Sequence, residues 1–222
     1  EYAKAYPCLR ACRTVRQSVE ESVASGTDKE KLRRRILNTW LRERGRTRGN
    51  GTDVEQVRFL GGLTPAGRVW KTESLTALCE KIYEIQDAYH VGAEVLAELR
   101  SMILSDGFAP ITCLDPDCPG RISHLLIPEL QLGFVTTDHE FSLHRKPWRR
   151  LCAERLIDKN YIALFRGKLR MRERLAAALE QDGGEHLRLA GEKHDELELI
   201  YRPFVDFDGV IAAAEAECRR IF

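Results

Sequence analysis

The chain has 222 residues and a net charge of +1, because 35 Lys and Arg residues stand against 34 Asp and Glu residues. This balance argues against a strongly basic nucleic-acid-binding tail and against an acidic solvating tail. Hydrophobic residues make up 43% of the chain and charged residues 31%, a composition that predicts a folded domain rather than a disordered segment.

The first 44 residues predict two helices. Apolar side chains recur at helical spacing over 3–24, and Ser-Gly-Thr at 25–27 ends this pattern. Asp28 is placed to cap a second helix, whose apolar face carries Leu32, Ile36 and Trp40.

A basic run overlaps the second helix and the glycine-rich linker that follows it at 45–52. Residues 29–48 hold nine Lys or Arg against two Glu. Such a run is typical of a solvated helix face, and the alternative is a footprint for phosphate or nucleic acid. The arginines of the run are Arg33, Arg34, Arg35, Arg42, Arg44, Arg46 and Arg48.

Residues 53–147 predict an α/β unit, because short apolar runs alternate with an amphipathic helix at 91–105. We expect strands at 57–60, 81–85, 108–113, 124–127 and 132–136, a turn-rich loop at 61–67 and a short helix at 75–79. A strand, a helix and a second strand joined by a tight first turn predict a right-handed βαβ unit and a parallel sheet.

Residues 148–222 predict a second helical lobe, with apolar residues spaced about 3.5 apart. Gln181-Asp182-Gly183-Gly184 interrupts this pattern, so we expect one helix to end there and another to begin. Pro203 ends the second helix, and Asp206 is placed to cap a last one.

A shift of the chain by 178 residues aligns the two ends. Asp28 then falls on Asp206, and Val19 falls on Leu197. We therefore predict that 13–41 and 191–219 are the same two-helix hairpin, and that residues 1–44 close a preceding half. The α/β unit would cover the apolar face of this first hairpin only in part. That face, which includes Leu9, Val19, Val23 and Ile36, would meet a preceding homologous half or a second copy of the chain.

Five short motifs follow one another after residue 57. They are Phe59-Leu-Gly-Gly-Leu-Thr64-Pro65-Ala-Gly67, Cys113-Leu-Asp115-Pro116-Asp117, Ile127-Pro-Glu-Leu130, Thr136-Thr-Asp-His139 and Lys193-His194-Asp195-Glu196-Leu197-Glu198. In these motifs the chain resembles a bacterial family of tandem P-loop proteins, ATPase-like or nucleotide-kinase-like, with two similar halves. The resemblance covers about 57–222 and implies a P-loop NTPase-like parallel sheet with flanking helices.

The resemblance places a P-loop at 87–94. A working loop, GxxxxGK[ST], wraps phosphates with backbone N–H groups, neutralises them with Lys and holds Mg²⁺ with Ser or Thr. Gly92 keeps the second glycine, but Asp87, Ala93 and Glu94 replace the first glycine, the Lys and the Ser or Thr. Two like charges 4 Å apart cost about 4 kcal/mol at an effective dielectric constant of 20. We therefore expect no ATP or Mg²⁺ at the positions of nucleotide contact, which are Gly92, Ala93, Glu94 and Thr136.

Three residues at strand ends are the candidates for catalysis. Asp115 and Asp117 follow a strand, where open α/β sheets bind ligands, and either of them could hold Mg²⁺ or accept a hydroxyl group. The alternative is turn chemistry around Pro116. His139 also ends a strand, as an acid–base group or as a structural hydrogen-bonding group. We expect no metal site, because the strand pattern disfavours the one conceivable zinc set, Cys113, Cys118, His124 and His139.

The sequence thus predicts a hairpin and linker at 1–52, a degenerate P-loop unit at 53–147 and a helical lobe at 148–222. The favoured function is a non-catalytic scaffold or regulatory half. The runner-up is an enzyme that binds a nucleotide or phosphorylated ligand at the sheet edge, and the third class is a nucleic-acid-binding module. Scattered cysteines without a CxxC pair, no secretory signal and no long apolar run predict a cytoplasmic protein.

Overall fold

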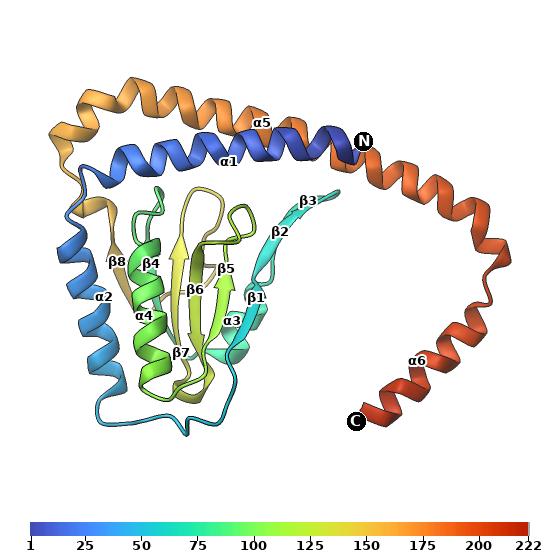
Figure 1. The fold of residues 1–222 in the computed structure, drawn as a ribbon, viewed down its shortest axis with the longest axis horizontal. Helices are drawn as coiled ribbons and strands as arrows, with labels where there is room; N and C mark the ends of the chain where they lie inside the picture. The colour runs from blue at the N-terminus through green and yellow to red at the C-terminus, as the bar shows by residue number, and fades with distance from the viewer. Residues whose placement is uncertain (222) are drawn as a thin grey trace.

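A six-stranded sheet forms the centre of the α/β fold in the computed structural model, which describes residues 1–221 (Figure 1). Its order is β1-β5-β6-β7-β4-β8. Only β6 is antiparallel to its two neighbours, so the predicted α/β class and mostly parallel sheet are confirmed. The strands are β1 (Gln56–Phe59), β4 (Lys81–Gln86), β5 (Ile111–Leu114), β6 (Ile122–Ile127), β7 (Leu132–Thr137) and β8 (Arg149–Cys152).

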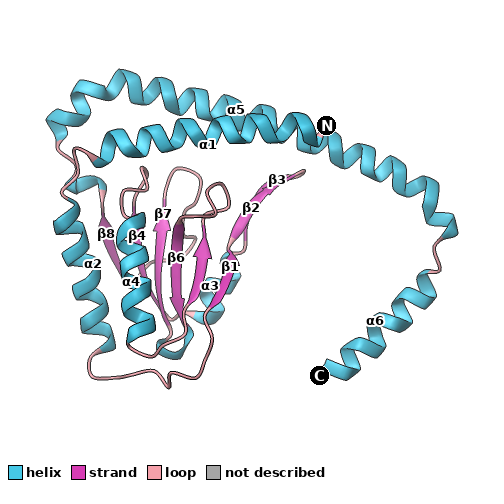
Figure 2. Ribbon diagram, in the orientation of Figure 1, coloured by secondary structure: helices cyan, strands magenta, loops and turns pink. Residues whose placement is uncertain are grey.

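Helices cover both faces of this sheet, but unequally (Figure 2). On one face, α2 (Lys29–Arg44) and α4 (Ala93–Ser105) enclose a large apolar core with Tyr83 and Phe134. On the other face, the short α3 (Thr72–Leu78) covers a smaller core around Ile82. Every residue of β7 is buried, as expected for a strand that is packed on both faces.

Three strands, β2, β3 and β8, lie where the sequence predicted none. The expected loop at 61–67 belongs to a hairpin of β2 (Gly61–Thr64) and β3 (Gly67–Trp70), which turns at Gly67 with a positive φ of 105°. That backbone conformation favours glycine. The third strand is β8, at the start of a segment predicted to be helical throughout, and it pairs with β4 through backbone hydrogen bonds.

A pair of long helices crosses the sheet edge at which the parallel strands end (Figure 1). They are α1 (Tyr2–Ala24) and α5 (Lys159–Tyr201), which lie side by side. The break expected at 181–184 is wrong, because α5 runs without interruption for 43 residues. A Cβ atom on Gly183 would lie 2.7 Å from the Leu9 side chain, so this glycine permits the close approach of α1.

The remaining segments are short 3-10 turns and the last helix. The turns are η1 (Pro128–Leu130), η2 (Glu154–Leu156) and η3 (Arg202–Phe204), and the helix is α6 (Phe207–Ile221). None of the helices in residues 1–221 combines the length and the apolar sequence that crossing a bilayer requires.

The two predicted cap positions are confirmed. The Asp28 carboxylate accepts a hydrogen bond from Lys31 N at 2.9 Å, and the Asp206 carboxylate accepts one from Gly209 N at 2.9 Å. Each aspartate therefore satisfies a backbone donor of the first turn of its helix.

The prediction that the apolar face of the first hairpin is only partly covered within this chain is wrong. Val19, Val23 and Ile36 are all buried within the same chain, in the large core, and Leu9 is half-buried against α5. A run of exposed apolar residues lies instead on the end of α5 and on α6, which extend away from the sheet (Figure 1).

The two neighbouring glycines of α5 provide a matched test of helix packing. We predict that Gly183→Leu lowers the free energy of unfolding by about 1 to 3 kcal/mol, because the new side chain meets Leu9 on α1. Gly184→Leu is the control, because a Cβ atom there meets nothing within 4 Å, and it should raise stability by up to about 1 kcal/mol through helix propensity. Urea unfolding measures both variants, and equal effects would contradict the close approach of α1.

Candidate functional site

A cavity of about 450 Å³ lies at the carboxyl edge of the sheet, beneath α1 and α5. Three loops line it, and each follows a parallel strand: 88–90 after β4, 115–117 after β5 and 138–141 after β7. Ligands of open α/β sheets bind at this edge, so the cavity is the candidate functional site.

The loop between β4 and α4 is closed by its own aspartate. The Asp87 carboxylate accepts hydrogen bonds from Val91 N at 3.0 Å and from Gly92 N at 2.7 Å, and the residue is 2% exposed. Those N–H groups stand at the amino end of α4, where a helix attracts anions. Burial raises the pKa of Asp87 to about 6, although both hydrogen bonds lower it. At pH 7 the side chain is therefore mostly an anion that occupies this position.

The predicted nucleotide contacts do not converge on the cavity. Gly92 directs its N–H to Asp87, and Ala93 begins α4. Glu94 is exposed and pairs with Lys29 Nζ at 2.8 Å, so its charge lies away from the loop interior. Only Thr136, buried at the end of β7, lines the cavity.

Asp115 organises a turn. Its Oδ1 accepts hydrogen bonds from Asp117 N at 2.8 Å and from Cys118 N at 3.0 Å, and its Oδ2 accepts one from Arg121 Nε at 3.0 Å. Burial raises the pKa of Asp115, but the neighbouring Arg121 guanidinium outweighs this effect and holds it below its usual value. This geometry matches the turn alternative around Pro116.

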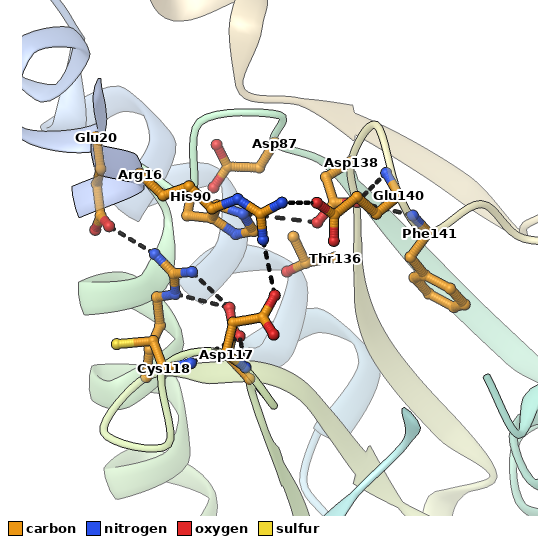
Figure 3. Close-up of polar contacts among 12 residues, drawn as sticks. Arg16, Glu20, Asp87, His90, Asp117, Cys118, Thr136, Asp138, Glu140 and Phe141 are labelled. Atoms are coloured by element: carbon orange, nitrogen blue, oxygen red, sulfur yellow. Dashed lines mark hydrogen bonds and ion pairs between the residues drawn. The ribbon is translucent and has the colours of Figure 1, made fainter. Parts of the chain in front are cut away.

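Asp117 belongs to a cluster of five charged side chains over the cavity, of which Figure 3 labels Arg16, Asp117 and Glu140. Arg16 NH1 lies 2.8 Å from Asp117 and also pairs with Glu140 and Glu180, while Arg68 pairs with the same three carboxylates. Burial raises the pKa of Glu140 to about 7, against the opposite effect of the two arginines. The three carboxylates lie close enough to share a cation, but each of them already pairs with both guanidinium groups.

Two histidines that the sequence analysis left without a functional role lie in the cavity wall. His90 Nε2 lies 3.6 Å from Asp138 Oδ2, and His124 Nδ1 accepts a hydrogen bond from Thr136 N at 3.2 Å. Burial lowers the pKa of both imidazoles to about 4, so both are neutral at pH 7. His139, the third candidate for catalysis after Asp115 and Asp117, lies at the exposed rim of the cavity.

The disfavoured zinc set does not assemble. Cys113 is buried in the smaller apolar core, and the one group of three potential metal ligands found within residues 1–221 consists of Asp117, Glu140 and Glu180. The sequence pattern alone did not reveal the place of His124 in the cavity wall. That place depends on the strand register, in which the antiparallel β6 sets His124 opposite Val135 of β7.

Several arginines of the basic run pair with acids of the same chain. Arg33 Nε lies 2.7 Å from Glu98, and both Arg44 and Arg48 pair with Asp106. These pairs reduce the positive charge that the run offers to nucleic acid.

Comparison of the chain with protein-family models, with curated proteins and with solved structures gives no match in any of the three. The family suggested by the motifs stays a prediction, and the proposals below rest on the geometry.

Burial of Asp87 predicts a specific dependence of stability on pH. The folded protein holds this proton more tightly than the unfolded chain, so the stabilising contribution is complete below pH 3.8 and is lost as the pH rises through about 6. A pKa difference of about two units corresponds to about 3 kcal/mol. Because asparagine does not ionise, the Asp87→Asn variant does not lose this stabilising contribution as the pH rises.

Urea unfolding between pH 4 and 7 measures the difference. The free energy of unfolding of Asp87→Asn, relative to the unaltered protein, should rise by about 2 kcal/mol across this range, since part of the change lies below pH 4. The exposed Asp195, changed to Asn, controls for the removal of one negative charge. Parallel pH curves for Asp87→Asn and the unaltered protein would contradict the buried carboxylate.

Proposed function

We propose that this chain is a P-loop NTPase-like α/β unit whose phosphate loop is closed, and that it acts as a non-catalytic scaffold or regulatory unit. The observation that carries the proposal is the Asp87 carboxylate, which receives the N–H groups of Val91 and Gly92. An internal anion thus holds the donors that a phosphate would need.

The negative charge of Asp87 and the absence of a Lys at position 93 both oppose the binding of phosphate in this loop. A phosphate in this loop would have to displace Asp87 or lie close to it, and two like charges 4 Å apart cost about 4 kcal/mol at an effective dielectric constant of 20. Ala93 stands where a phosphate-binding Lys is needed, and the nearby Lys29 is engaged by Glu94. No side chain of this loop neutralises an incoming triphosphate.

Calorimetry with Mg-ATP tests the closed loop. We predict no submillimolar binding and no turnover for the unaltered chain. Asp87→Gly frees the two backbone donors, so weak ATP binding should appear, whereas Asp195→Gly on the exposed part of α5 should bind no more than the unaltered chain. Circular dichroism confirms that each variant is folded.

The opposite pattern would reject the proposal. Micromolar, Mg-dependent ATP binding by the unaltered chain, abolished by changes in 87–94, would show that the loop is a working nucleotide site. Asp87→Gly that folds and gains no affinity would show that the loop donors are not arranged for phosphate.

The C-terminal arm, defined here as residues 191–221, supplies the scaffold surface. Its exposed large apolar side chains are Leu197, Leu199, Ile200, Tyr201, Phe204, Phe207, Val210, Ile211 and Ile221. In the 178-residue alignment, Val19 is 7% exposed and its counterpart Leu197 is 53% exposed. The pattern that packs in the first hairpin is thus unpartnered in the arm. A second copy of the chain, which brings the same apolar surface, is the partner that we propose for the arm.

Light scattering coupled to size exclusion tests this pairing. We predict a dimer for the unaltered chain and a shift towards monomer for Ile200→Ser combined with Ile211→Ser, because both side chains lie in the exposed arm. Leu164→Ser combined with Met171→Ser is the matched control, since these exposed residues lie on the first half of α5. A monomer at every concentration for the unaltered chain would reject the pairing.

A second candidate function is the binding of a small molecule in the cavity. Two observations favour small-molecule binding: the cavity has a volume of about 450 Å³, and the Nε2 atom of His124 in its wall makes no hydrogen bond within residues 1–221.

A further inference from the structure

The charges around the cavity are already paired. Arg16 and Arg68 lie among three carboxylates, and Arg121 pairs with Asp115 and with Glu20. Within the described chain, therefore, each arginine that lines the cavity has at least one carboxylate partner. An anionic ligand would find no unengaged guanidinium and would meet an excess of carboxylates.

One neutral donor in the wall has no acceptor. The His124 ring is 2% exposed, and its Nδ1 accepts the Thr136 N–H, so its hydrogen lies on Nε2. No hydrogen bond of this Nε2 is found within residues 1–221, and it is not among the fully enclosed unpartnered nitrogens, so a group in the cavity can reach it. Trp70, which also lines the cavity, has a buried Nε1 without a partner. A fully buried donor such as Trp70 Nε1 is rarely left without a partner.

Flat apolar surfaces make up much of the remaining wall. The rings of Trp70 and Phe141 lie 4.7 Å apart at 39°, and the His124 ring lies 5.4 Å from Phe141. Tyr89 lines the cavity from the loop after β4. Such faces favour stacking with a planar ring. Figure 3 shows Thr136 and Phe141 near Asp117 and Glu140 of the charged cluster over the cavity.

We propose that the cavity binds an uncharged planar ring compound that carries a hydrogen-bond acceptor, which the His124 Nε2–H group recognises. The inference rests on the second candidate function, small-molecule binding, and is independent of the closed loop. An uncharged ligand leaves the arginine–carboxylate pairs intact, and its acceptor satisfies the buried imidazole donor.

Three probes with the same ring system test the class of ligand: 2-naphthamide, 2-naphthoate and 2-naphthylmethylammonium. Calorimetry and tryptophan fluorescence follow binding to the full chain, because Trp70 lines the cavity. Naphthamide should bind at least about tenfold more tightly than naphthoate, which brings an unpaired negative charge, and more tightly than the ammonium probe, which has no acceptor.

His124→Asn tests the donor. The Asn Oδ1 atom replaces Nδ1 as the acceptor for Thr136 N, but no N–H group remains at the position of Nε2. Naphthamide binding should weaken about tenfold, whereas 2-methylnaphthalene, which lacks an acceptor, should bind the variant and the unaltered chain alike. His144→Asn, outside the cavity lining, is the matched control, and thermal unfolding confirms the fold of each variant.

The outcomes separate two failures. Equal or tighter binding of naphthoate or the ammonium probe would overturn the proposed class while small-molecule binding stands. Absence of binding by all probes would overturn both the class and the second candidate function, while the Mg-ATP result remains independent. A folded His124→Asn protein with unchanged naphthamide affinity would overturn the role of His124.

Discussion

The ion-pair cluster of Arg16, Arg68, Asp117, Glu140 and Glu180 holds the helical layer to the sheet. Its members come from α1, β3, the loop after β5, the loop after β7 and α5. Removing charges from water is costly unless each has partners, so the cluster is stable only when all five segments are in place. The cavity exists because this arrangement spans the strand ends while leaving space beneath it.

Negative charge is also paired inside the loop after β4, where the partners are backbone N–H groups. A helix amino end attracts negative charge, and here the attraction is satisfied by Asp87 from within the loop. His90 takes a positive φ of 55° in this loop and lies near Asp138. The loop therefore contributes to the cavity wall while its own backbone donors are engaged. Engagement of the donors at the amino end of α4 and the presence of a separate cavity are compatible parts of one arrangement.

The two helical ends of the chain differ in what covers them. Residues of α1 and α2 pack against α4 and α5, and Val23 and Ile36 are fully buried. The arm has the same cap position and a comparable apolar pattern, but it extends beyond the sheet (Figure 1). Burial of apolar area is the main favourable term in folding and association, so the exposed arm is the part of this structure that gains most from a partner.

Local physical chemistry made several features predictable from the sequence alone. The alternation of strands with the helix at 93–105 followed from periodicity, the caps at Asp28 and Asp206 followed from side-chain chemistry, and a carboxylate in the loop before this helix was visible as Asp87. Only the tertiary structure decided the continuity of α5 through Gly183, because packing against α1 outweighs the low helix propensity of glycine. It alone also decided the inward turn of Asp87 and the placement of His124, because each depends on contacts between segments distant in sequence or on the burial that those contacts create. Composition and spacing report which side chains are available, whereas burial and pairing determine which of them face the site.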